Sequence, residues 1–312
     1  MKVLHVVPGL DVIGNGISVA AKLIAGEQNA DLIEARHFAG GKGDISQFDE
    51  VWVHSAWLPT VLLSCGRVLK AGKRLVRMSH ANYDPVRLAY HSWKKRLLSP
   101  IDRHYLQKAD KIVATCDAEA DWIRSYLGHH CPPIIITDIK RFFKLVSGGV
   151  ESGGVCSTNS QLTTHNSQLH LLYLGRRHPL KGLSYLESAL ATYYNMLSQP
   201  TPLDLPPEAP DTTYYNKCPI EFRAVSNASG DELEKVWDWC DVLILPTLSD
   251  NFGLVIAEAL ERGKRVITTD GAPAWNDGND YGGRLIYIKG YRDGSPAERV
   301  RLLKDAIERL CK

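Results

Sequence analysis

The sequence has almost no net charge and no long apolar run. Its 37 basic and 35 acidic residues leave a formal net charge of +2, so bulk charge does not favour nucleic acid as a partner. No apolar run approaches the roughly 20 residues that a membrane-spanning helix needs. The opening apolar run ends at Pro8. It lacks the hydrophobic length and cleavage site of a signal peptide and is expected to form a first strand.

Cysteine pairs and metal-binding patterns are also missing. The seven cysteines are scattered, odd in number and without Cys-x-x-Cys spacing. Cys116 and Cys240 lie at expected strand or helix ends in apolar surroundings. This favours reduced thiols in a cytoplasmic protein over a disulfide framework or a zinc site. The sequence has no Asp-x-Asp pair to hold a metal ion, so no obligatory metal is expected.

The first 140 of the 312 residues alternate apolar runs with amphipathic segments. A chain of this length is enough for about two domains. Strands are expected at residues 3–7, 32–37, 51–54, 74–78, 111–115 and 134–137, and helices at 16–27, 57–71, 87–108 and 117–127. This alternation predicts a parallel sheet with helices on both faces.

A segment rich in Gly, Ser and Thr follows at 147–168 and is expected to be a flexible linker. Beyond it, strands are expected at 169–174, 220–225, 242–245, 265–268 and 284–288, and helices at 181–197, 230–240, 253–262 and 296–310. A proline-rich stretch at 199–210 is expected to be a surface loop. The sequence therefore predicts two doubly wound α/β domains, at 1–146 and 169–312, with a ligand cleft between them.

The most informative segment is Ser-Asp-Asn-Phe-Gly-Leu-Val-Ile-Ala-Glu at 249–258, which leads from an expected strand into a helix. Asp250 and Glu258 supply carboxylates, while Asn251 and Gly253 let the backbone lie close to a ligand. The N-terminus of the helix offers free N–H groups to an anion. Hydroxyl-binding and phosphate-binding groups together suit a nucleotide sugar.

This segment resembles the acid-x7-Glu signature of the family 4 retaining glycosyltransferases, with Asp250 where that family mostly has Glu. A second motif, Gly-Arg-Arg-His-Pro-Leu-Lys-Gly at 175–182, resembles the family's Gly-Arg-x4-Lys-Gly loop. Arg176 and Lys181 match its motif positions, whereas Arg177 is expected to be a solvated neighbour. Arg offers a bidentate fork to phosphate oxygens and Lys a mobile point charge, which suits a diphosphate leaving group.

The resemblance implies the GT-B architecture, in which two Rossmann-like domains face a central cleft. It also implies that Glu258 holds ribose hydroxyls and that Asp250, with the backbone at 251–253, holds the donor sugar. Catalysis is then mainly electrostatic, since cations and a helix N-terminus stabilise the departing diphosphate. The implied donor-binding and catalytic residues of this half are Arg176, Lys181, Asp250, Asn251, Phe252, Gly253, Leu254 and Glu258.

The stretch Gly14-Asn15-Gly16 follows the first expected strand and resembles the N-terminal glycine loop of the same transferases. Backbone N–H groups of that loop face the donor phosphate or the acceptor. The dinucleotide fingerprint Gly-x-Gly-x-x-Gly fails here because its third glycine is Val19, and no P-loop motif occurs in the chain. A plain pair of loop glycines is the alternative.

The segment at 77–85 resembles the family's Pro-His-Gly-Met-x-Glu/Asp-Pro segment, whose His contacts the donor sugar. His80 is therefore a candidate catalytic residue. Asp84 either touches the acceptor or caps the helix expected after Pro85. His54 and Trp57, which follow the third expected strand, are further candidates for the acceptor cleft.

Basic residues gather at 67–74 and again at 94–103, where Trp93, Leu97 and Ile101 are interleaved with them. A solvated helix face is one interpretation. The other is peripheral contact with anionic lipid. A solvated face is the commoner case, and the lipid-linked acceptors of many family members keep the second interpretation open.

The expected function is transfer of a hexosyl group, with retention, from a nucleotide-diphosphate sugar to a glycan or lipid-linked acceptor. The favoured donor is a UDP-sugar, and the expected context is cell-surface polysaccharide or lipopolysaccharide synthesis on the cytoplasmic side, with no cofactor beyond the donor. One alternative is a nucleotide-sugar epimerase of GT-B fold, which would need a base/acid pair absent from these motifs. The other is a catalytically inert subunit that stabilises a partner transferase. The presence of intact Arg176, Lys181 and Glu258 argues against this second alternative.

Overall fold

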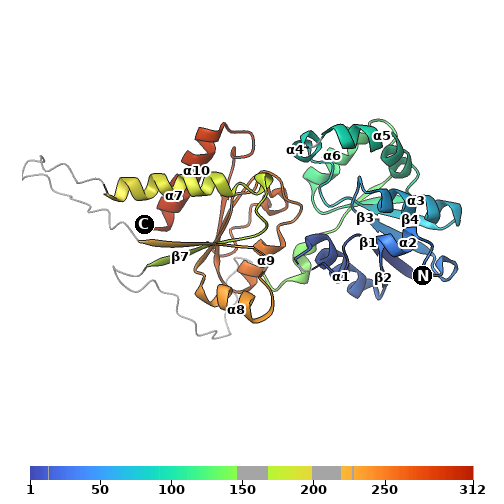
Figure 1. Cartoon of the computed structure of the whole chain (residues 1–312), viewed down its shortest axis with the longest axis horizontal. Coiled ribbons are helices and arrows are strands. Elements are labelled where there is room, and N and C mark those ends of the chain that lie inside the picture. The colour runs from blue at the N-terminus through green and yellow to red at the C-terminus, as the bar shows by residue number, and fades with distance from the viewer. Residues whose placement is uncertain (13, 91, 146–167, 199–218, 227, 312) are drawn as a thin grey trace, which may run out of the picture. The chain divides into compact units, whose positions relative to one another are not determined.

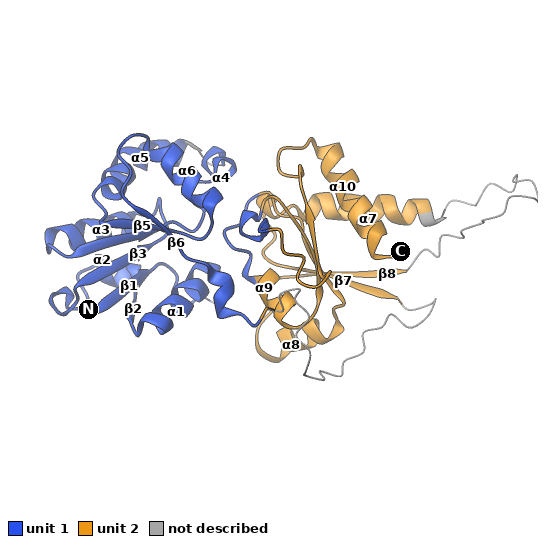
Figure 2. Cartoon of the chain, turned by 180° about the vertical axis from the view of Figure 1, so that it is seen from behind, with its two compact units in different colours: residues 1–144, 249–254, 272–277 blue, residues 145–248, 255–271, 278–312 orange. Residues whose placement is uncertain are grey.

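The computed structural model describes residues 1–12, 14–90, 92–145, 168–198, 219–226 and 228–311. The expected linker, apart from residue 168, and the proline-rich stretch at 199–210 lie outside these ranges. Contacts divide the chain into two compact units (Figure 2). Unit 1 contains residues 1–144, 249–254 and 272–277, and unit 2 contains residues 145–248, 255–271 and 278–312.

Unit 1 is built on a six-stranded parallel sheet in the order β2-β1-β3-β4-β5-β6. The strands are β1 (Val3–Val7), β2 (Asp31–Glu34), β3 (Glu50–His54), β4 (Arg74–Met78), β5 (Lys111–Ala114) and β6 (Ile134–Ile136). Every residue of β1 and β3 is buried, as expected for central strands covered on both faces. The order of the strands reverses between β1 and β3. Doubly wound sheets bind ligands at such a point, at the carboxyl ends of the strands.

Helices cover both faces of this sheet (Figure 1). They are α1 (Gly16–Gln28), α2 (Ala35–Ala39), α3 (Pro59–Lys70), α4 (Pro85–Ala89), α5 (Ser92–Gln107) and α6 (Asp117–Leu127), with short 3-10 turns η1 (Ile45–Gln47) and η2 (Ile139–Phe142). Helices α2, α3, α5 and α6 contact one another in turn, whereas α1 packs against β1 and β2. The apolar core between sheet and helices includes Val51, Cys65, Leu75, Ile112 and Ile123.

Two expected elements of unit 1 are wrong in their extent. The expected strand at 32–37 ends at Glu34, because the Glu34 side chain accepts a hydrogen bond from the backbone N–H of Arg36 at 3.4 Å and starts α2. The expected helix at 87–108 is divided into α4 and α5. The Lys95 ammonium, from α5, donates to the carbonyls of Arg87 and Tyr90 at the end of α4.

Unit 2 is built on a five-stranded parallel sheet in the order β11-β10-β9-β7-β8. The strands are β7 (Leu169–Leu174), β8 (Ile220–Val225), β9 (Val242–Leu245), β10 (Arg265–Thr269) and β11 (Leu285–Ile288). The helices are α7 (Leu183–Ser198), α8 (Gly230–Trp239), α9 (Leu254–Glu261) and α10 (Pro296–Leu310), with 3-10 turns η3 (Pro179–Lys181) and η4 (Pro273–Trp275). The strand order reverses between β7 and β9. The predicted α/β class with two doubly wound parallel sheets is confirmed.

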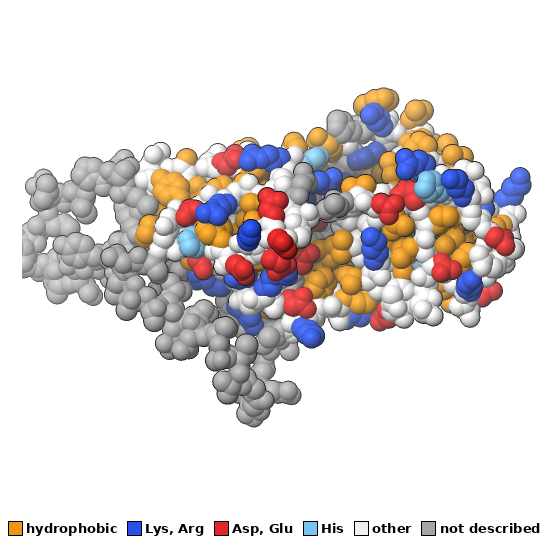
Figure 3. All heavy atoms as spheres, turned by 60° about the horizontal axis from the view of Figure 1, so that its bottom comes forward, with side chains coloured by type: hydrophobic (Ala, Val, Ile, Leu, Met, Phe, Trp, Pro, Cys, Tyr) orange, Lys and Arg blue, Asp and Glu red, His pale blue; other side chains and the backbone are white. Residues whose placement is uncertain are grey.

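The surface mixes charges of both signs. On the face seen in Figure 3, acidic and basic side chains are interspersed, in keeping with the small net charge. Within the described ranges, no helix has both the length and the apolar character to cross a bilayer. The described cysteines, Cys65, Cys116, Cys131, Cys240 and Cys311, are free thiols.

Candidate functional site

The loops that follow β7 and β9 are joined at the carboxyl edge of the unit 2 sheet. The two strands are neighbours, and the order of the sheet reverses between them. The carbonyl of Leu180 accepts hydrogen bonds from the backbone N–H of Leu248 at 2.8 Å and from the hydroxyl of Thr247 at 3.0 Å. The Arg-Lys motif and the start of the acid-x7-Glu segment therefore leave the sheet side by side.

Glycine is required where these loops meet. Gly182 has φ +68°, and a Cβ there would lie 1.9 Å from the carbonyl oxygen of Pro246. A Cβ on Gly271, after β10, would lie 2.0 Å from the carbonyl oxygen of Thr247. Neither position has room for a side chain. The close packing explains physically why the Lys-Gly pair of the motif ends in glycine.

Arg176 and Arg177 occupy different surroundings in the loop after β7. Both side chains are exposed, and the guanidinium of Arg177 lies 3.9 Å from the carboxylate of Glu187. The side chain of Arg176 makes no ion pair with the described residues, while its carbonyl accepts a hydrogen bond from the hydroxyl of Tyr173 at 2.8 Å. Lys181 is half-buried at the end of η3. Arg176 thus has an available guanidinium on a fixed backbone.

Glu258 lies one turn into α9, with its carboxylate largely removed from water. Burial raises the pKa of Glu258, and the nearby charge of Arg262 offsets this only in part. No side chain or backbone N–H in the described part of the chain donates a hydrogen bond to this carboxylate. A carboxylate in such a position is suited to hydroxyl donors brought by a ligand.

In unit 1, the loop after β1 is fixed by side chains on both sides. The carboxylate of Glu34 accepts from the backbone N–H of Gly9 at 3.3 Å and of Leu10 at 2.8 Å. Asn15 caps α1 and donates to the carbonyls of Pro8 and Gly9 at 3.0 and 2.9 Å. Gly14 has φ +72°, and Gly16 begins α1. The predicted glycine loop is therefore the start of a capped helix at the carboxyl edge of the sheet.

The turn after β4 is strained and is held by one buried carboxylate. His80 and Ala81 are consecutive non-glycine residues with φ +55° and +56°, a conformation that costs roughly 1–2 kcal/mol per residue. The carboxylate of Glu119 accepts from the Ser79 hydroxyl at 2.6 Å, from the Ala81 N–H at 2.5 Å and from the Thr115 N–H and hydroxyl at 2.8 Å each. Strain of this kind persists where the surroundings fix it, often at functional sites.

Unit 1 brings this turn together with residues 249–251. The side-chain nitrogen of Asn251 lies 3.2 Å from His80 Nδ1, and its oxygen lies 3.1 Å from the Thr115 hydroxyl. The hydroxyl of Ser249 donates to the carboxylate of Asp84. Arg87 Nε donates to the Ser249 hydroxyl at 2.9 Å. Two motifs about 170 residues apart in the sequence thus meet at one cluster.

The remainder of the segment is positioned by local contacts. The Asp250 carboxylate accepts from the backbone N–H of Asn251 at 2.8 Å. Phe252 is buried, and its carbonyl accepts from the indole N–H of Trp275 at 2.5 Å. Gly253 has φ +68° immediately before Leu254, the first residue of α9. The backbone turns sharply here into the helix N-terminus.

The three candidate acceptor residues have structural contacts of their own. His54 is 0% exposed and lies between His5 and His80. Trp57 packs edge-on against two tyrosine rings, with centroids 5.6 and 5.5 Å away. Asp84 caps α4 by accepting from the N–H of Val86 at 2.9 Å, the second of the two roles expected for it. An acceptor role for the three stays a prediction.

Sequence reasoning missed Glu119, Thr115, Arg87 and His5 as parts of this cluster. The available signal for Thr115 was that it directly follows β5, because adjacent parallel strands bring polar residues at their carboxyl ends together. Glu119 and Arg87 lie in the helices that follow β5 and β4, where this signal does not apply. His5 gave no such signal because it lies in the middle of β1, inside an apolar run.

Burial keeps three histidines of the cluster neutral near pH 7. Desolvation lowers the pKa of His5 to about 4 and that of His80 to about 3. Desolvation also lowers the pKa of His54 well below its ordinary value, and the neighbouring His80, His5 and Arg77 lower it further. His80 therefore offers a ligand a neutral ring.

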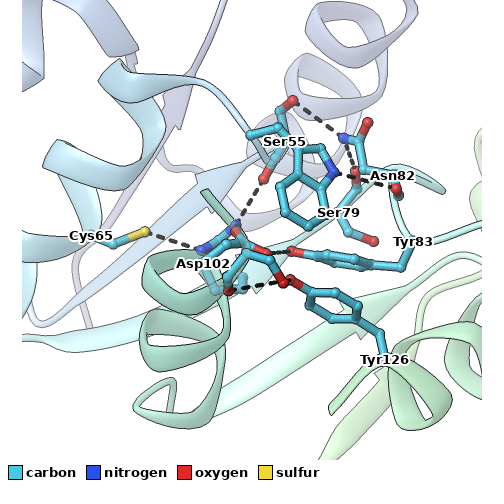
Figure 4. Close-up of polar contacts among 10 residues, drawn as sticks. Ser55, Cys65, Ser79, Asn82, Tyr83, Asp102 and Tyr126 are labelled. Atoms are coloured by element: carbon cyan, nitrogen blue, oxygen red, sulfur yellow. Dashed lines mark hydrogen bonds and ion pairs between the residues drawn. The ribbon is translucent and has the colours of Figure 1, made fainter. Parts of the chain in front are cut away.

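A buried ionic network lies beside the residues that flank the strained turn, Ser79, Asn82 and Tyr83 (Figure 4). The Arg77 guanidinium lies 3.4 Å from Asp102, donates to the Ser55 carbonyl at 3.0 Å and lies 3.3 Å from Cys65 Sγ. The Tyr83 hydroxyl donates to the second oxygen of Asp102 at 2.7 Å. The network ties α5 to β4 and to the turns after β3 and β4.

A metal site was not expected from the sequence. Across the residues that the structure describes, no group of three His, Cys, Asp or Glu side chains is arranged to hold a metal ion. The absence of an obligatory metal stays a prediction.

Comparison with known proteins gives a family match for part of the chain. Residues 28–137 match the family model described as Glycosyltransferase Family 4. No curated protein matches the chain in sequence.

Several solved glycosyltransferases share the fold. Sucrose-phosphate synthase from Thermosynechococcus elongatus has a TM-score of 0.61 and 12% identity, covering 99% of this chain and 90% of that chain. An α,α-trehalose 6-phosphate synthase from Burkholderia multivorans has a TM-score of 0.52 and 15% identity, covering 94% and 67%. The pneumococcal O-GlcNAc transferase in complex with UDP and GlcNAc has a TM-score of 0.50 and 14% identity, covering 95% and 53%. The domain match and the shared GT-B fold together support a glycosyltransferase that resembles family 4.

Proposed function

We propose that the protein is a retaining glycosyltransferase. It moves a hexosyl group from a nucleotide-diphosphate sugar, with a UDP-sugar favoured, to a glycan or lipid-linked acceptor in cell-surface polysaccharide or lipopolysaccharide synthesis. The observation that carries the proposal is the junction of the loops after β7 and β9 at the reversal point of the unit 2 sheet. One of these loops bears Arg176 and Lys181, and the other begins the acid-x7-Glu segment.

The proposed chemistry is stabilisation of a departing diphosphate. Arg176 supplies an exposed guanidinium fork, and Lys181 adds a second positive charge from the same loop. The N-terminus of α9 adds unpaired N–H groups. Charge that develops on the leaving group meets these preorganised donors, so the protein needs no strong general base.

Glu258 and the 250–253 segment have the proposed role of holding the donor. The buried Glu258 carboxylate accepts two vicinal ribose hydroxyls, and these bonds lower its pKa again because they favour the charged form. Asp250 and the backbone of Asn251 and Gly253 bind hydroxyls of the sugar, next to the neutral ring of His80. The capped helix start at Gly14 and Gly16 offers N–H groups to the phosphate or the acceptor.

Helix α5 supports peripheral contact with an anionic membrane surface. Trp93, Leu97 and Ile101 recur every four residues and are 65, 73 and 48% exposed. Lys94, Arg96 and Arg103 are exposed on the same helix, whose only acidic residue, Asp102, is buried. Apolar and basic side chains in this pattern suit a lipid surface.

Three of the basic residues at 67–74, Arg67, Lys73 and Arg74, do not extend this face. Arg67 donates to three carbonyls of the segment at 38–43. Lys73 donates to the Ser46 carbonyl, and Arg74 pairs with Glu50 at 2.9 Å. These three cations make contacts within the protein, so the proposed membrane contact rests on α5.

A vesicle flotation assay tests the membrane contact. The wild type is expected to float with vesicles that contain anionic phosphatidylglycerol and not with pure phosphatidylcholine. Leu97→Ser removes apolar area from the face and weakens flotation. Leu63→Ser, at an exposed leucine of α3, leaves it unchanged. Equal recovery with both vesicle types contradicts the proposal.

Release of nucleoside diphosphate from purified UDP-glucose, GDP-mannose and ADP-glucose, without and with added glycan, tests the proposed reaction. The wild type is expected to release diphosphate from one donor, and the sugar product keeps the anomeric configuration. Arg176→Ala lowers the rate by about 10²–10³-fold, the usual cost of one such charge contact. Arg177→Ala, whose side chain pairs with Glu187, serves as the matched control and stays close to wild type.

The same assay separates the two alternatives. An epimerase converts the donor sugar without net loss of nucleotide sugar, which chromatography of the donor reveals. A catalytically inert subunit releases no diphosphate from any donor, and Glu258→Ala then leaves the cellular glycan unchanged. Either result contradicts the proposed function.

A further inference from the structure

Three histidine rings of unit 1 form a continuous hydrogen-bonded row. His5 lies on β1, His54 ends β3 and His80 lies in the turn after β4. These three strands are neighbours in the sheet. His5 Nδ1 lies 2.9 Å from His54 Nε2, and His54 Nδ1 lies 2.8 Å from His80 Nε2. In both pairs the ring centroids are 5.1 Å apart and the ring planes are inclined by about 30°. The contacts therefore run from edge to edge, as N–H···N hydrogen bonds require.

Amide side chains close the row at both ends. His5 Nε2 lies 2.8 Å from the side-chain oxygen of Gln28, the last residue of α1. His80 Nδ1 lies 3.2 Å from the side-chain nitrogen of Asn251. Gln28 is exposed, whereas His54 and His80 are buried. The row thus leads from the protein surface at the end of α1, across neighbouring strands of the sheet, to the cluster at Asn251.

Counting protons leaves two arrangements for this row. A neutral imidazole carries one N–H donor and one acceptor nitrogen. The row contains four hydrogen bonds, but its three neutral rings supply only three protons. One terminal amide must therefore donate with its nitrogen, and the other must accept with its oxygen.

The structure shows one of the two arrangements. Asn251 turns its amide nitrogen to His80, and Gln28 turns its oxygen to His5. Each ring then accepts at Nδ1 and carries its proton on Nε2. Rotation of both amides reverses every bond and places the proton of each ring on Nδ1.

We propose that His5 and His54 are positioning residues that couple the tautomer of His80 and the amide of Asn251 to Gln28, so that the row changes tautomer as one unit. The coupling decides whether His80 presents an acceptor or a donor at Nδ1. It also decides which atom Asn251 turns to the rest of the cluster. A ligand that fixes the Asn251 amide selects one arrangement for the whole row. The inference rests on contacts within unit 1 and holds whether or not the proposed function does.

The charged neighbours of the row keep the proton count at three. Arg77 lies next to His54 and Arg87 next to His80, and both oppose protonation of these rings. Glu50 acts in the opposite sense on His5, but burial outweighs it. Trp52 covers the His5 ring at a centroid distance of 5.0 Å. None of the three rings is therefore charged near pH 7.

Nuclear magnetic resonance of the full chain with ¹⁵N-labelled histidine tests the coupling, because ring ¹⁵N shifts distinguish the two neutral tautomers and the imidazolium. In the wild type, His5, His54 and His80 are expected to show the same tautomer. Gln28→Glu places an obligatory acceptor at one end and fixes the proton on Nε2 of all three rings. Asn251→Asp places an obligatory acceptor at the other end and fixes it on Nδ1.

A double variant and a matched control sharpen the test. Gln28→Glu combined with Asn251→Asp puts acceptors at both ends, so the row takes up a fourth proton and one ring becomes an imidazolium at pH 7. Asn29→Asp adds the same charge next to Gln28 without contact to His5, and it leaves the tautomers as in the wild type. Different tautomers among the three rings of the wild type, or the same His80 tautomer in both single variants, overturn the proposal.

Discussion

Gly182 shows how one residue fixes the geometry of the proposed phosphate loop. It has φ +68°, follows Lys181 and leaves no space for a Cβ beside the Pro246 carbonyl. The sequence indicated its place in a motif but not the reason for it. The reason is a contact between loops that are about 60 residues apart in the chain, and no local pattern encodes such a contact.

Gly182→Ala is expected to destabilise the protein and to weaken nucleotide binding. The positive φ alone costs roughly 1–2 kcal/mol. The clash at 1.9 Å adds to this because it forces the loop after β7 away from β9. Urea unfolding measures the loss of stability. Gly283→Ala is the matched control, since Gly283 has φ +76° and open space around it. Equal losses in the two variants contradict the proposed contact.

The buried histidines predict that the protein loses stability in mild acid. Between about pH 6.5 and pH 4 the unfolded chain binds protons at His5, His54 and His80, whereas the folded chain does not, because burial lowers their pKa. The unfolded state therefore binds more protons, and stability falls as pH falls through this window. Each histidine contributes up to about 1.4 kcal/mol per pH unit.

Urea unfolding at pH 7, 6 and 5 measures this dependence. His54→Gln removes one of the three groups and is expected to reduce the slope of unfolding free energy against pH. His104→Gln, at an exposed position of α5, leaves the slope unchanged. A slope that is the same in wild type and His54→Gln counts against a neutral buried row.

At the scale of elements, most strands and helices follow from the sequence because their apolar periodicity is strong. The strands at 74–78 and 242–245 and the helix at 296–310 have the predicted bounds. The exceptions are decided by single side chains: Glu34 begins α2 within an expected strand, and Lys95 stabilises the end of α4. Capping of this kind depends on tertiary contacts as well as on local propensity.

Asp102 is expected to be the main polar anchor of α5. It is fully buried and accepts from Arg77 and Tyr83, so Asp102→Ala leaves a buried guanidinium without its carboxylate. Removing one partner of such a pair typically costs about 3–5 kcal/mol. Urea unfolding followed by tryptophan fluorescence measures the loss. Asp121→Ala, which breaks the exposed pair with Arg124, is the control and leaves stability nearly unchanged. Similar stabilities of the two variants contradict the anchoring role.

At the scale of the whole molecule, the two doubly wound sheets were predictable from the alternation of strands and helices. Which segments pack together in each unit was not predictable from this alternation. Residues 249–254 and 272–277 pack with the N-terminal residues in unit 1, although they follow strands of the unit 2 sheet. Alternation shows which elements exist, but it does not show with which unit a connecting loop packs. This is why the contacts of Asn251 with His80 and of Ser249 with Asp84 could not be predicted from the sequence.

The proposed function requires that a nucleotide diphosphate binds at the loop after β7. Calorimetric titration of the purified protein with UDP, GDP and ADP, repeated on Arg176→Ala and on the control Arg177→Ala, tests it most directly. One nucleotide is expected to bind in the micromolar range, and Arg176→Ala alone is expected to abolish this binding. No binding of any of the three nucleotides, or equal binding to the two variants, would contradict it.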